Sequence, residues 1–304
     1  MLACKNAGLQ VIARAMTGSV TNLTRLPRRP VPVTPIPHQH SMTTKVADIT
    51  NWMETVAPLR LSADWDNTGL LLGDAARTVR RLMTCLTLTP ESVGEAVAGR
   101  ADLVISHHPL PFRPLKKITT QEPTGRLLWQ LASAGVSVYC PHTAWDSAAR
   151  GINAMLAERL GLSDCRPLVP EASENGVLGA GRLGVLAQTM SVPELAKRIS
   201  ESVPHCRMRA VIASESVRKV AIVCGSGASL LDAAIKQGCD LFLTGEATFH
   251  QCLESQAAGV SMLMIGHFAS EKFAMDQLAV LCGAEFADVE AWASLSEKDP
   301  VSSI

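Results

Sequence analysis

The sequence has no excess of charge and no long apolar run. Its 28 basic residues balance 28 acidic ones over 304 residues. A general nucleic-acid binder needs a basic face that displaces counterions, so we do not expect nucleic acid as a partner. No apolar run reaches the roughly 18–20 residues that a membrane span requires, so no membrane partner is expected either.

The chain also lacks any Cys-x-x-Cys pair, although it contains nine cysteines. Their number is odd, their spacing is irregular, and several lie inside apolar runs. These features predict buried, reduced thiols and argue against a structural zinc site built from cysteine pairs. We therefore expect a reducing compartment and a cytoplasmic location.

Residues 1–44 contain no acidic residue, and the first one in the chain is Asp48. The segment is rich in arginine and proline. Such a composition resembles a mitochondrial transit peptide, which we expect if the source is eukaryotic. For a bacterial source we expect a disordered extension, or a true start at Met42 instead of Met1.

The rest of the chain alternates helix-like and strand-like segments, which predicts an α/β fold. Apolar residues make up 47% of the sequence, enough to fill the core of one large domain or of two lobes. We expect a first α/β lobe over residues 45–165 and a linker with a small βαβ unit over 166–216. A C-terminal βα segment over 217–304 would then complete the candidate site.

The most informative stretch is a short apolar run followed by two histidines. Leu103 to Ile105 predicts a buried strand, and Pro109 stops it because proline has no N–H for a ladder. Adjacent side chains on a strand point to opposite faces. His107 and His108 can therefore face one point only if the strand ends there and the chain turns. The alternative is one core histidine beside a surface one.

Polar side chains follow two other predicted strands in the same way. Asp146 comes after the strand at 136–140, where an ordinary helix N-cap is the alternative. His267 and Glu271 come after the strand at 261–265. They occupy positions i and i+4 in the first turn of the last predicted helix, so they share one face of it.

In open α/β sheets, ligands bind at the carboxyl ends of strands, where we expect these side chains to meet. The candidate metal ligands are His107, His108, Asp146, His267 and Glu271. Three imidazoles and two carboxylates suit Zn, Mn, Fe or Co. Five ligands are too many for one catalytic zinc, but they suit two divalent cations about 3.5–4 Å apart with a bridging carboxylate.

Three more polar residues fall at the same edge of the predicted sheet. They are Glu246, His142 and His250. We take them as catalytic candidates that orient the metal ligands or transfer protons.

Two further segments are candidate rims of the site. Residues 64–73 place two acids, an amide and two glycines around a strand-like run, where an Asx turn that feeds a strand is the alternative. The proline-rich loop at 109–117 carries Arg113, Lys116 and Lys117. These side chains either face an anionic substrate or are simply solvated.

Five motifs occur in order along the chain. They are WDNTGLL (65–71), ISHHPLPFRPLKKIT (105–119), YCPHTAWD (139–146), LTGE (243–246) and GHFASE (266–271). In combination they resemble the Nif-three-like family, often labelled GTP cyclohydrolase I type 2 homologs, over about Lys45 to Phe286. The resemblance implies a two-lobed α/β fold with mixed sheets flanked by helices, and a metal site in the cleft at the C-terminal ends of strands.

The same resemblance assigns the metal ligands residue by residue. It places them on His107, His108, Asp146, His267 and Glu271, with Glu271 contacting both metals. It also implies a ring-shaped homo-hexamer. Some members carry an extra domain inserted in mid-chain, and the segment at 166–216 is too short to hold it, so we expect the short form.

The expected activity follows from the ligand set and the resemblance together. A pair of divalent cations lowers the pKa of bound water, which suits hydrolysis. We expect a metal-dependent hydrolase that acts on a nucleotide or phosphoester, and the family label suggests GTP. The alternative is a non-enzymatic metal-binding scaffold or regulatory interaction protein.

Overall fold

The computed structural model describes residues 43–172 and 176–302. The predictions for residues 1–42, including a start at Met42, lie outside this range. Among the described residues, no helix combines the length and the apolar composition that crossing a membrane requires. All eight cysteines there are free and five of them are buried, as the irregular spacing predicted.

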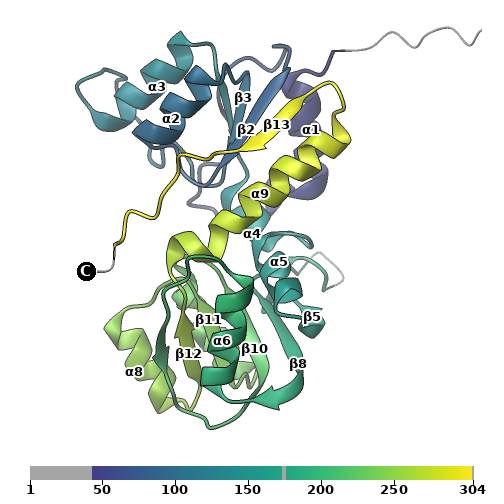
Figure 1. Cartoon of the computed structure of the whole chain (residues 1–304), viewed down its shortest axis with the longest axis vertical. Coiled ribbons are helices and arrows are strands. Elements are labelled where there is room, and N and C mark those ends of the chain that lie inside the picture. Colours follow the sequence, from purple (N-terminus) through teal and green to yellow (C-terminus); the bar gives the residue numbers. More distant parts are fainter. Residues whose placement is uncertain (1–42, 173–175, 303–304) are drawn as a thin grey trace, which may run out of the picture. The chain divides into compact units, whose positions relative to one another are not determined.

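Two mixed sheets carry the fold (Figure 1), which confirms the predicted α/β class. The first sheet has five strands in the order β1-β4-β3-β2-β13. They are β1 (Gly69–Leu72), β2 (Arg81–Cys85), β3 (Leu103–Ser106), β4 (Ser137–Cys140) and β13 (Glu290–Ala293). β4, β3, β2 and β13 run parallel, and β1 is antiparallel to β4. The carboxyl ends of β3 and β4 therefore lie at one edge.

Helices cover both faces of the first sheet, so its central strands are apolar on both sides. Leu82 and Ile105 pack with α1 and α9 on one face, and Met83 and Val104 pack with α2 and α3 on the other. Thr89 caps α2 by accepting a hydrogen bond from Ser92 N. The helices are α1 (Val46–Val56), α2 (Pro90–Ala98), α3 (Pro123–Ser133) and α9 (His267–Glu285).

The second sheet has six strands in the order β5-β8-β10-β11-β12-β9. Its three central strands, β10, β11 and β12, run parallel, and β8 and β9 flank them in antiparallel pairing. The strands are β5 (Ser163–Arg166), β8 (Arg182–Met190), β9 (Arg209–Val211), β10 (Val217–Val223), β11 (Leu241–Thr244) and β12 (Ser261–Met264). A separate small hairpin joins β6 (Val169–Pro170) to β7 (Gly179–Ala180).

The second sheet is also covered on both faces. Val220 and Leu243 face a core shared with α5 and α6, whereas Ala221 and Phe242 face a smaller core shared with α7 and α8. The remaining helices are α4 (His142–Ser147), α5 (Ile152–Arg159), α6 (Val192–Ser202), α7 (Leu231–Lys236) and α8 (Phe249–Ala257), with short 3-10 turns at Leu59–Leu61 and Gly227–Leu230.

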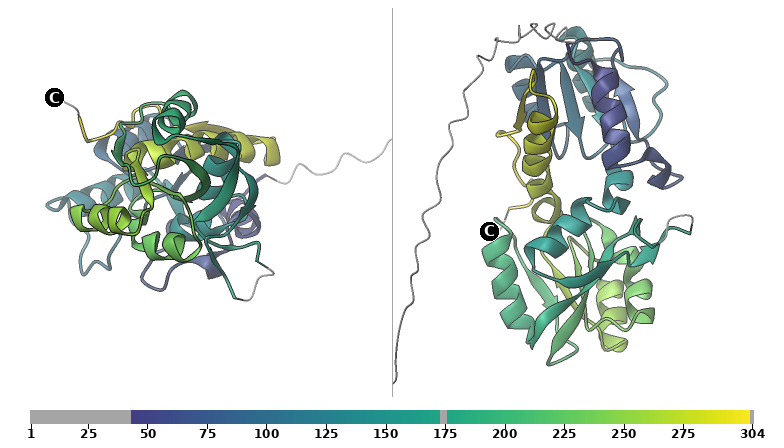
Figure 2. Two further views of the ribbon diagram at one scale, coloured as in Figure 1. Left: turned by 90° about the horizontal axis from the view of Figure 1, so that it is seen from below. Right: turned by 90° about the vertical axis from the view of Figure 1, so that its right-hand side faces the viewer.

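One hydrophobic core connects the two sheets. It runs from Leu82 and Ile105 in the first sheet, through Phe273 of α9, to Val220 and Leu243 in the second. Helix α9 starts at the end of β12 and extends along the first sheet, which the right-hand view of Figure 2 also shows. The carboxyl ends of strands from both sheets are thereby held close to the first turn of α9.

Three features differ from the sequence expectations. Strand β13 was not predicted and returns the C-terminal segment to the edge of the first sheet, beside β2. Strands β8 and β9, assigned by sequence to a separate small unit, pair with β10 and β12 in the second sheet. The chain after β4 forms a short helix, α4, which was not predicted.

Candidate metal centre

The twin histidines lie where β3 ends. Backbone pairing continues one step beyond the strand, because His107 N donates to Cys85 O and His108 N donates to Leu86 O, at 2.9 and 2.8 Å. The two rings nevertheless lie beside each other, with centroids 5.0 Å apart. The turn that the sequence required at this point is therefore present. His107 is only 1% exposed, and His108 is half-buried.

Helix α4 brings Asp146 to the same place. The helix begins at His142, directly after β4 and Pro141, and Asp146 lies four residues further along, on the same face as His142. Asp146 Oδ1 lies 3.8 Å from His107 Nε2. Because the N-caps of α4 and α5 are Pro141 and Gly151, Asp146 is not the N-cap that was the alternative.

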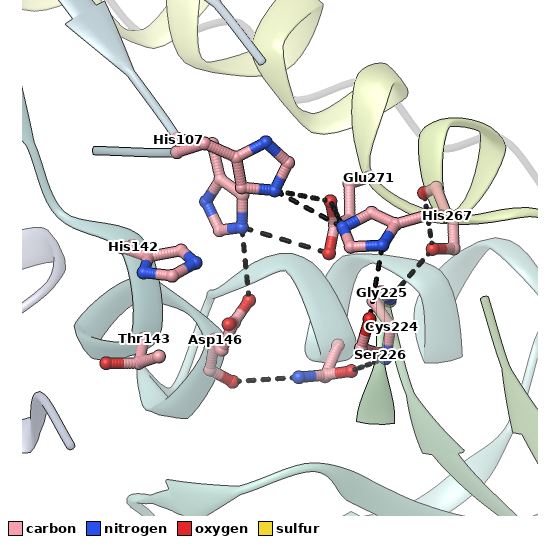
Figure 3. A network of polar contacts seen from close by, with 12 residues as sticks. His107, His142, Thr143, Asp146, Cys224, Gly225, Ser226, His267 and Glu271 are labelled. Carbon is pink, nitrogen blue, oxygen red and sulfur yellow. Dashed lines mark hydrogen bonds and ion pairs between the residues drawn. The ribbon is translucent and has the colours of Figure 1, made fainter. Parts of the chain in front are cut away.

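The first turn of α9 supplies the second half of the cluster (Figure 3). Its N-cap, Gly266, has φ +93°, a left-handed conformation that favours glycine, and His267 follows at the end of β12. Ser270 Oγ accepts a hydrogen bond from Gly225 N and donates one to His267 O, which ties this turn to the end of β10. A Cβ at Gly225 would come within 2.2 Å of Glu271 Oε1, so this position requires glycine.

The five predicted ligands meet at one point between the two sheets. His108 Nε2 and His267 Nε2 lie 3.2 and 3.1 Å from Glu271 Oε2, and 3.3 Å from each other. The other oxygen, Glu271 Oε1, lies 3.9 Å from His107 Nε2. We call His108, His267 and Glu271 Oε2 the outer set, and His107, Asp146 and Glu271 Oε1 the inner set.

Two residues of the inner set have polar atoms without a hydrogen-bond partner in the protein. Both ring nitrogens of His107 and Oδ1 of Asp146 are buried in this state among the described residues, and so is Oε2 of Glu271 in the outer set. A buried polar atom without a partner costs free energy, so such atoms are rare unless they bind an ion or a ligand. The outer set, with two imidazole nitrogens and a carboxylate oxygen close together, likewise has the geometry and donor chemistry that could hold a metal ion.

Burial and neighbouring charges shift the pKa values of the cluster. Burial raises the pKa of Asp146 to about 7, assisted by the charge of Glu271, and it lowers the pKa of His107 well below its usual value. Burial would also raise the pKa of Glu271, but the adjacent imidazoles of His108 and His267 hold it well below its usual range. The same carboxylate, with Glu246, overcomes the effect of burial on His267 and raises its pKa to about 9.

A second carboxylate orients His267. The Nδ1 of His267 donates to Glu246 Oε1 at 3.0 Å, and Ser226 Oγ donates to the same oxygen. These hydrogen bonds lower the pKa of Glu246. Because an ionised carboxylate only accepts hydrogen bonds, Nδ1 of His267 carries a hydrogen, and Nε2 of the same ring faces His108 and Glu271. This is the arrangement in which metal-binding histidines are usually held.

His142 is held in the same way by Asp66. Their Nδ1 and Oδ1 atoms lie 2.7 Å apart, and Thr143 donates to Asp66 Oδ2 from both N and Oγ1. Burial would raise the pKa of Asp66, but the hydrogen bonds from His142 and Thr143 lower it to about 2. The pKa of His142 is raised: burial would lower it, but the hydrogen bond to Asp66 outweighs that effect.

The structure separates the three catalytic candidates. Glu246 contacts His267, and His142 lies beside His107, with ring centroids 5.1 Å apart. His142 forms with His107 and His108 a second group that could hold a metal ion, so it lies closer to the predicted ligands than the role of orienting them requires. His250 is exposed on α8, beside Phe249, and lines neither cavity described below.

Sequence reasoning missed several supporting residues. Asp66 lies in the WDNTGLL motif, which was recognised only as a possible rim. Asn153 links α4 to the end of β10, because its Nδ2 donates to Asp146 O and its Oδ1 accepts from Cys224 N. Thr87 Oγ1 lies 2.7 Å from His108 Nδ1. No sequence pattern marks Asn153 or Thr87.

Two cavities border the cluster. The first, of about 830 Å³, is lined by His108, His142, Asp146, His267 and Glu271 on one side. The second, of about 750 Å³, meets His108 and His267 from the other direction. The basic residues Arg113, Lys116 and Lys117 are exposed and line neither of these cavities.

The fold and the cluster define a class: an α/β protein of two mixed sheets whose strand ends gather histidines and carboxylates that could hold metal. The family model described as Duf34/NIF3 (NGG1p interacting factor 3) matches residues 44–300. The chain belongs to this family, as the motifs indicated.

Relatives from bacteria and animals match nearly the whole described chain. A Clostridium perfringens protein named GTP cyclohydrolase 1 type 2 homolog is 35% identical over 263 residues, which cover 84% of this chain and 98% of the relative. The Drosophila melanogaster NIF3-like protein 1 is 31% identical over 264 residues, covering 86% of this chain and 89% of the relative.

Solved structures share the fold. A Bacillus cereus protein related to NIF3 superposes with a TM-score of 0.79 at 22% identity, covering 87% of this chain and all of that one. A Staphylococcus aureus protein, SA1388, superposes with a TM-score of 0.78 at 24% identity, covering 86% of this chain and 99% of that one.

Proposed function

We propose that the cluster binds two divalent metal cations and that the protein is a metal-dependent hydrolase. The observation that carries the proposal is the position of Glu271. One of its oxygens faces His108 and His267, and the other faces His107, 3.9 Å away, with Asp146 beyond it. A carboxylate placed in this way suits the bridging position of a two-metal site.

The spacing of the outer set supports metal binding directly. Two ligand atoms that bind one zinc ion tetrahedrally at about 2.0–2.1 Å lie about 3.3 Å apart. The three distances within the outer set, 3.1 to 3.3 Å, match this value. The inner-set distances of 3.8 and 3.9 Å are wider by about half an ångström, so that set would contract on binding.

Bound cations would supply Lewis-acid chemistry and a water of lowered pKa. The protein residues have separate tasks around them. Glu246 fixes the ring of His267, and Asp66 fixes the ring of His142, with its free nitrogen on the side of the cavity. His142 is the group placed to carry a proton between the substrate and the cavity, because it lies beside the cluster and lines the cavity.

The substrate class is a nucleotide or another phosphoester. The name of the Clostridium perfringens relative points to a guanine nucleotide. The cavity of about 830 Å³ has the size of small-molecule sites and opens onto both ligand sets. We also expect the homo-hexamer, and measurement of the molar mass by light scattering tests it.

The test combines metal analysis with a turnover assay. Protein loaded separately with Zn, Mn, Fe or Co is offered GTP and a panel of phosphoesters. His267→Gln should lose turnover and part of its metal, whereas His250→Gln, an exposed histidine away from the cluster, should match the unaltered protein. Equal turnover by His267→Gln would contradict the proposal. Two bound metals without turnover of any substrate would favour the non-enzymatic scaffold.

A further inference from the structure

Two large aromatic side chains stand exposed at the mouth of the cavity that contains the metal cluster. Trp65 is 64% exposed and Phe112 is 48% exposed, and both line this cavity. Their ring centroids lie 5.9 Å apart with the planes tilted by 51°. Exposed aromatic residues that gather at a cavity usually mark a binding surface, because water around their apolar faces is unfavourable.

The two aromatic residues are held by hydrogen bonds of their neighbours. Asn67 Nδ2 donates to Pro111 O at 2.7 Å, which joins the segment of Trp65 to that of Phe112. Asp66, next to Trp65, is fixed by His142 and Thr143. The pair is therefore organised before any ligand arrives, which lowers the ordering cost of binding.

The path from this pair to the metal cluster is short. The ring centroid of Trp65 lies 6.1 Å from that of His142, and His142 in turn lies 5.6 Å from His108. One imidazole thus separates Trp65 from the outer set. A ligand with a planar ring at one end and an anionic group at the other could contact both.

We propose that Trp65 and Phe112 form the subsite for the planar heteroaromatic base of a nucleotide whose phosphate end reaches the metal cluster. This assignment rests on the proposed function, because it names the part of the substrate that the aromatic pair recognises. Base stacking on exposed aromatic rings is strong and requires no hydrogen-bond pattern. It also gives the WDNTGLL motif two tasks, since Asp66 orients His142 while Trp65 receives the base.

The chemistry of the rim favours an anionic heteroaromatic ligand over a plain apolar one. The loop that carries Phe112 also carries Arg113, Lys116 and Lys117, all exposed to solvent. Their positive charge attracts a phosphorylated ligand toward the cavity, even though these side chains do not line it. The cluster itself, with three imidazoles lining the cavity, suits the phosphate end.

The experiment measures binding by calorimetry and by tryptophan fluorescence. The probes are GMP, guanosine and ribose 5-phosphate, each with and without added zinc. The variants are Trp65→Leu, Trp65→Phe and the matched control Trp129→Phe, whose tryptophan is 57% exposed on α3 and lines neither cavity. Metal content and thermal melting confirm that each variant is folded.

We expect GMP and guanosine to quench the fluorescence of the unaltered protein and of Trp129→Phe. Trp65→Leu should bind GMP roughly ten-fold more weakly, the loss that removal of one stacked ring causes. Trp65→Phe should keep the affinity to within about three-fold but lose the quenching, because phenylalanine still stacks. Ribose 5-phosphate, which has no base, should bind all variants equally.

Three results would overturn the subsite. The first is that neither GMP nor guanosine binds, and the second is an unchanged GMP affinity in Trp65→Leu. The third is a loss of ribose 5-phosphate binding in Trp65→Leu that is as large as its loss of GMP binding. A change of molar mass in Trp65→Leu with unchanged GMP affinity would instead assign the aromatic pair to contact with a second copy. Guanosine binding that quenches Trp65 without any hydrolysis would keep the subsite and contradict the hydrolase, whereas hydrolysis with an unchanged KM in Trp65→Leu would do the reverse.

Discussion

The two ligand sets of the cluster share Glu271 but are built differently. The outer set contains His267, 34% exposed at its side chain, and its atoms already have the spacing of metal ligands. The inner set contains His107, 1% exposed, whose ring nitrogens have no protein partner. If the proposed cations bind, we expect the outer set to accept one readily and the inner set to depend on one to satisfy the ring nitrogens of His107.

Removal of the shared carboxylate should have the largest effect. Glu271→Gln should abolish the binding of both cations, and with it turnover. The loss of metal affinity should exceed the roughly 10–100-fold that follows when a residue that only hydrogen-bonds to a metal ligand is removed. Metal analysis after dialysis measures this, with Glu285→Gln, exposed on the same helix, as the control. Two tightly held metals in Glu271→Gln would show that the two sets do not share a bridge.

Loss of one ligand from each set should separate the two positions. Calorimetric titration of the unaltered protein should show two binding events, with the tighter one in the outer set. Asp146→Asn should retain the tight event and lose the weaker one, and His267→Gln should lose the tight event, each with an affinity loss of at least about ten-fold. If both variants lose the same single event, the cluster holds one ion.

Asp66 and Glu246, the carboxylates that orient His142 and His267, should differ in effect: we expect Asp66 to stabilise the fold and Glu246 to support metal binding. Asp66 is fully buried at its side chain and accepts from both His142 and Thr143. Asp66→Asn should therefore lower the free energy of unfolding by about 1–3 kcal/mol, because the new amide cannot accept all these donors. Glu246→Gln, half-exposed, should leave unfolding unchanged and weaken outer-set metal binding about ten-fold. Urea unfolding and metal titration of both variants check this, and equal stability loss would remove the distinction.

The smallest effect concerns the edge of the first sheet. Glu95 accepts hydrogen bonds from Trp292 Nε1 in β13, and from Ser294 Oγ and Ser296 N just beyond the end of that strand. Burial would raise the pKa of Glu95, but hydrogen bonds from Ser296, Ser294 and Leu295 lower it from 4.5 to about 2. A carboxyl whose pKa is lower when folded stabilises the fold above pH 4.5, and this contribution is lost as the pH falls toward 2.

We therefore expect Glu95→Gln to be less stable than the unaltered protein by about 1 kcal/mol at pH 6, a value reduced for solvent screening. The difference should shrink as the pH falls below 4.5 and disappear only below about pH 2. Urea unfolding at several pH values measures it, and Glu254→Gln, exposed on α8 beside the second sheet, is the control. A difference that stays constant with pH would show that Glu95 does not act through its charge.

The sequence predicted the parts of the fold that depend on local pattern. The strand ends that precede His107, Asp146 and His267 could be found because a short apolar run stops abruptly at polar residues. Placement of all five predicted ligands in one cluster then followed from a general property of parallel sheets. The carboxyl ends of strands in two separate sheets meet here, and the sequence did not show that there are two sheets with one shared core.

The remaining features depend on contacts between distant residues. Strand β13 is short and partly exposed at the sheet edge, so it has no apolar pattern of its own. The pairing of Asp66 with His142 joins residues 76 positions apart, and no local spacing indicates it. His250 was assigned to the edge because it follows β11. Helix α8, however, begins at Phe249, and His250 lies exposed on the surface of that helix.

Anomalous diffraction from crystals of the zinc-loaded protein tests the central claim most directly. The account predicts two peaks in each chain, about 3.5–4 Å apart on either side of the Glu271 carboxylate. One should lie among the outer set, with His108 and His267, and the other among the inner set, with His107 and Asp146. A single peak, or two peaks that do not both contact Glu271, would contradict it.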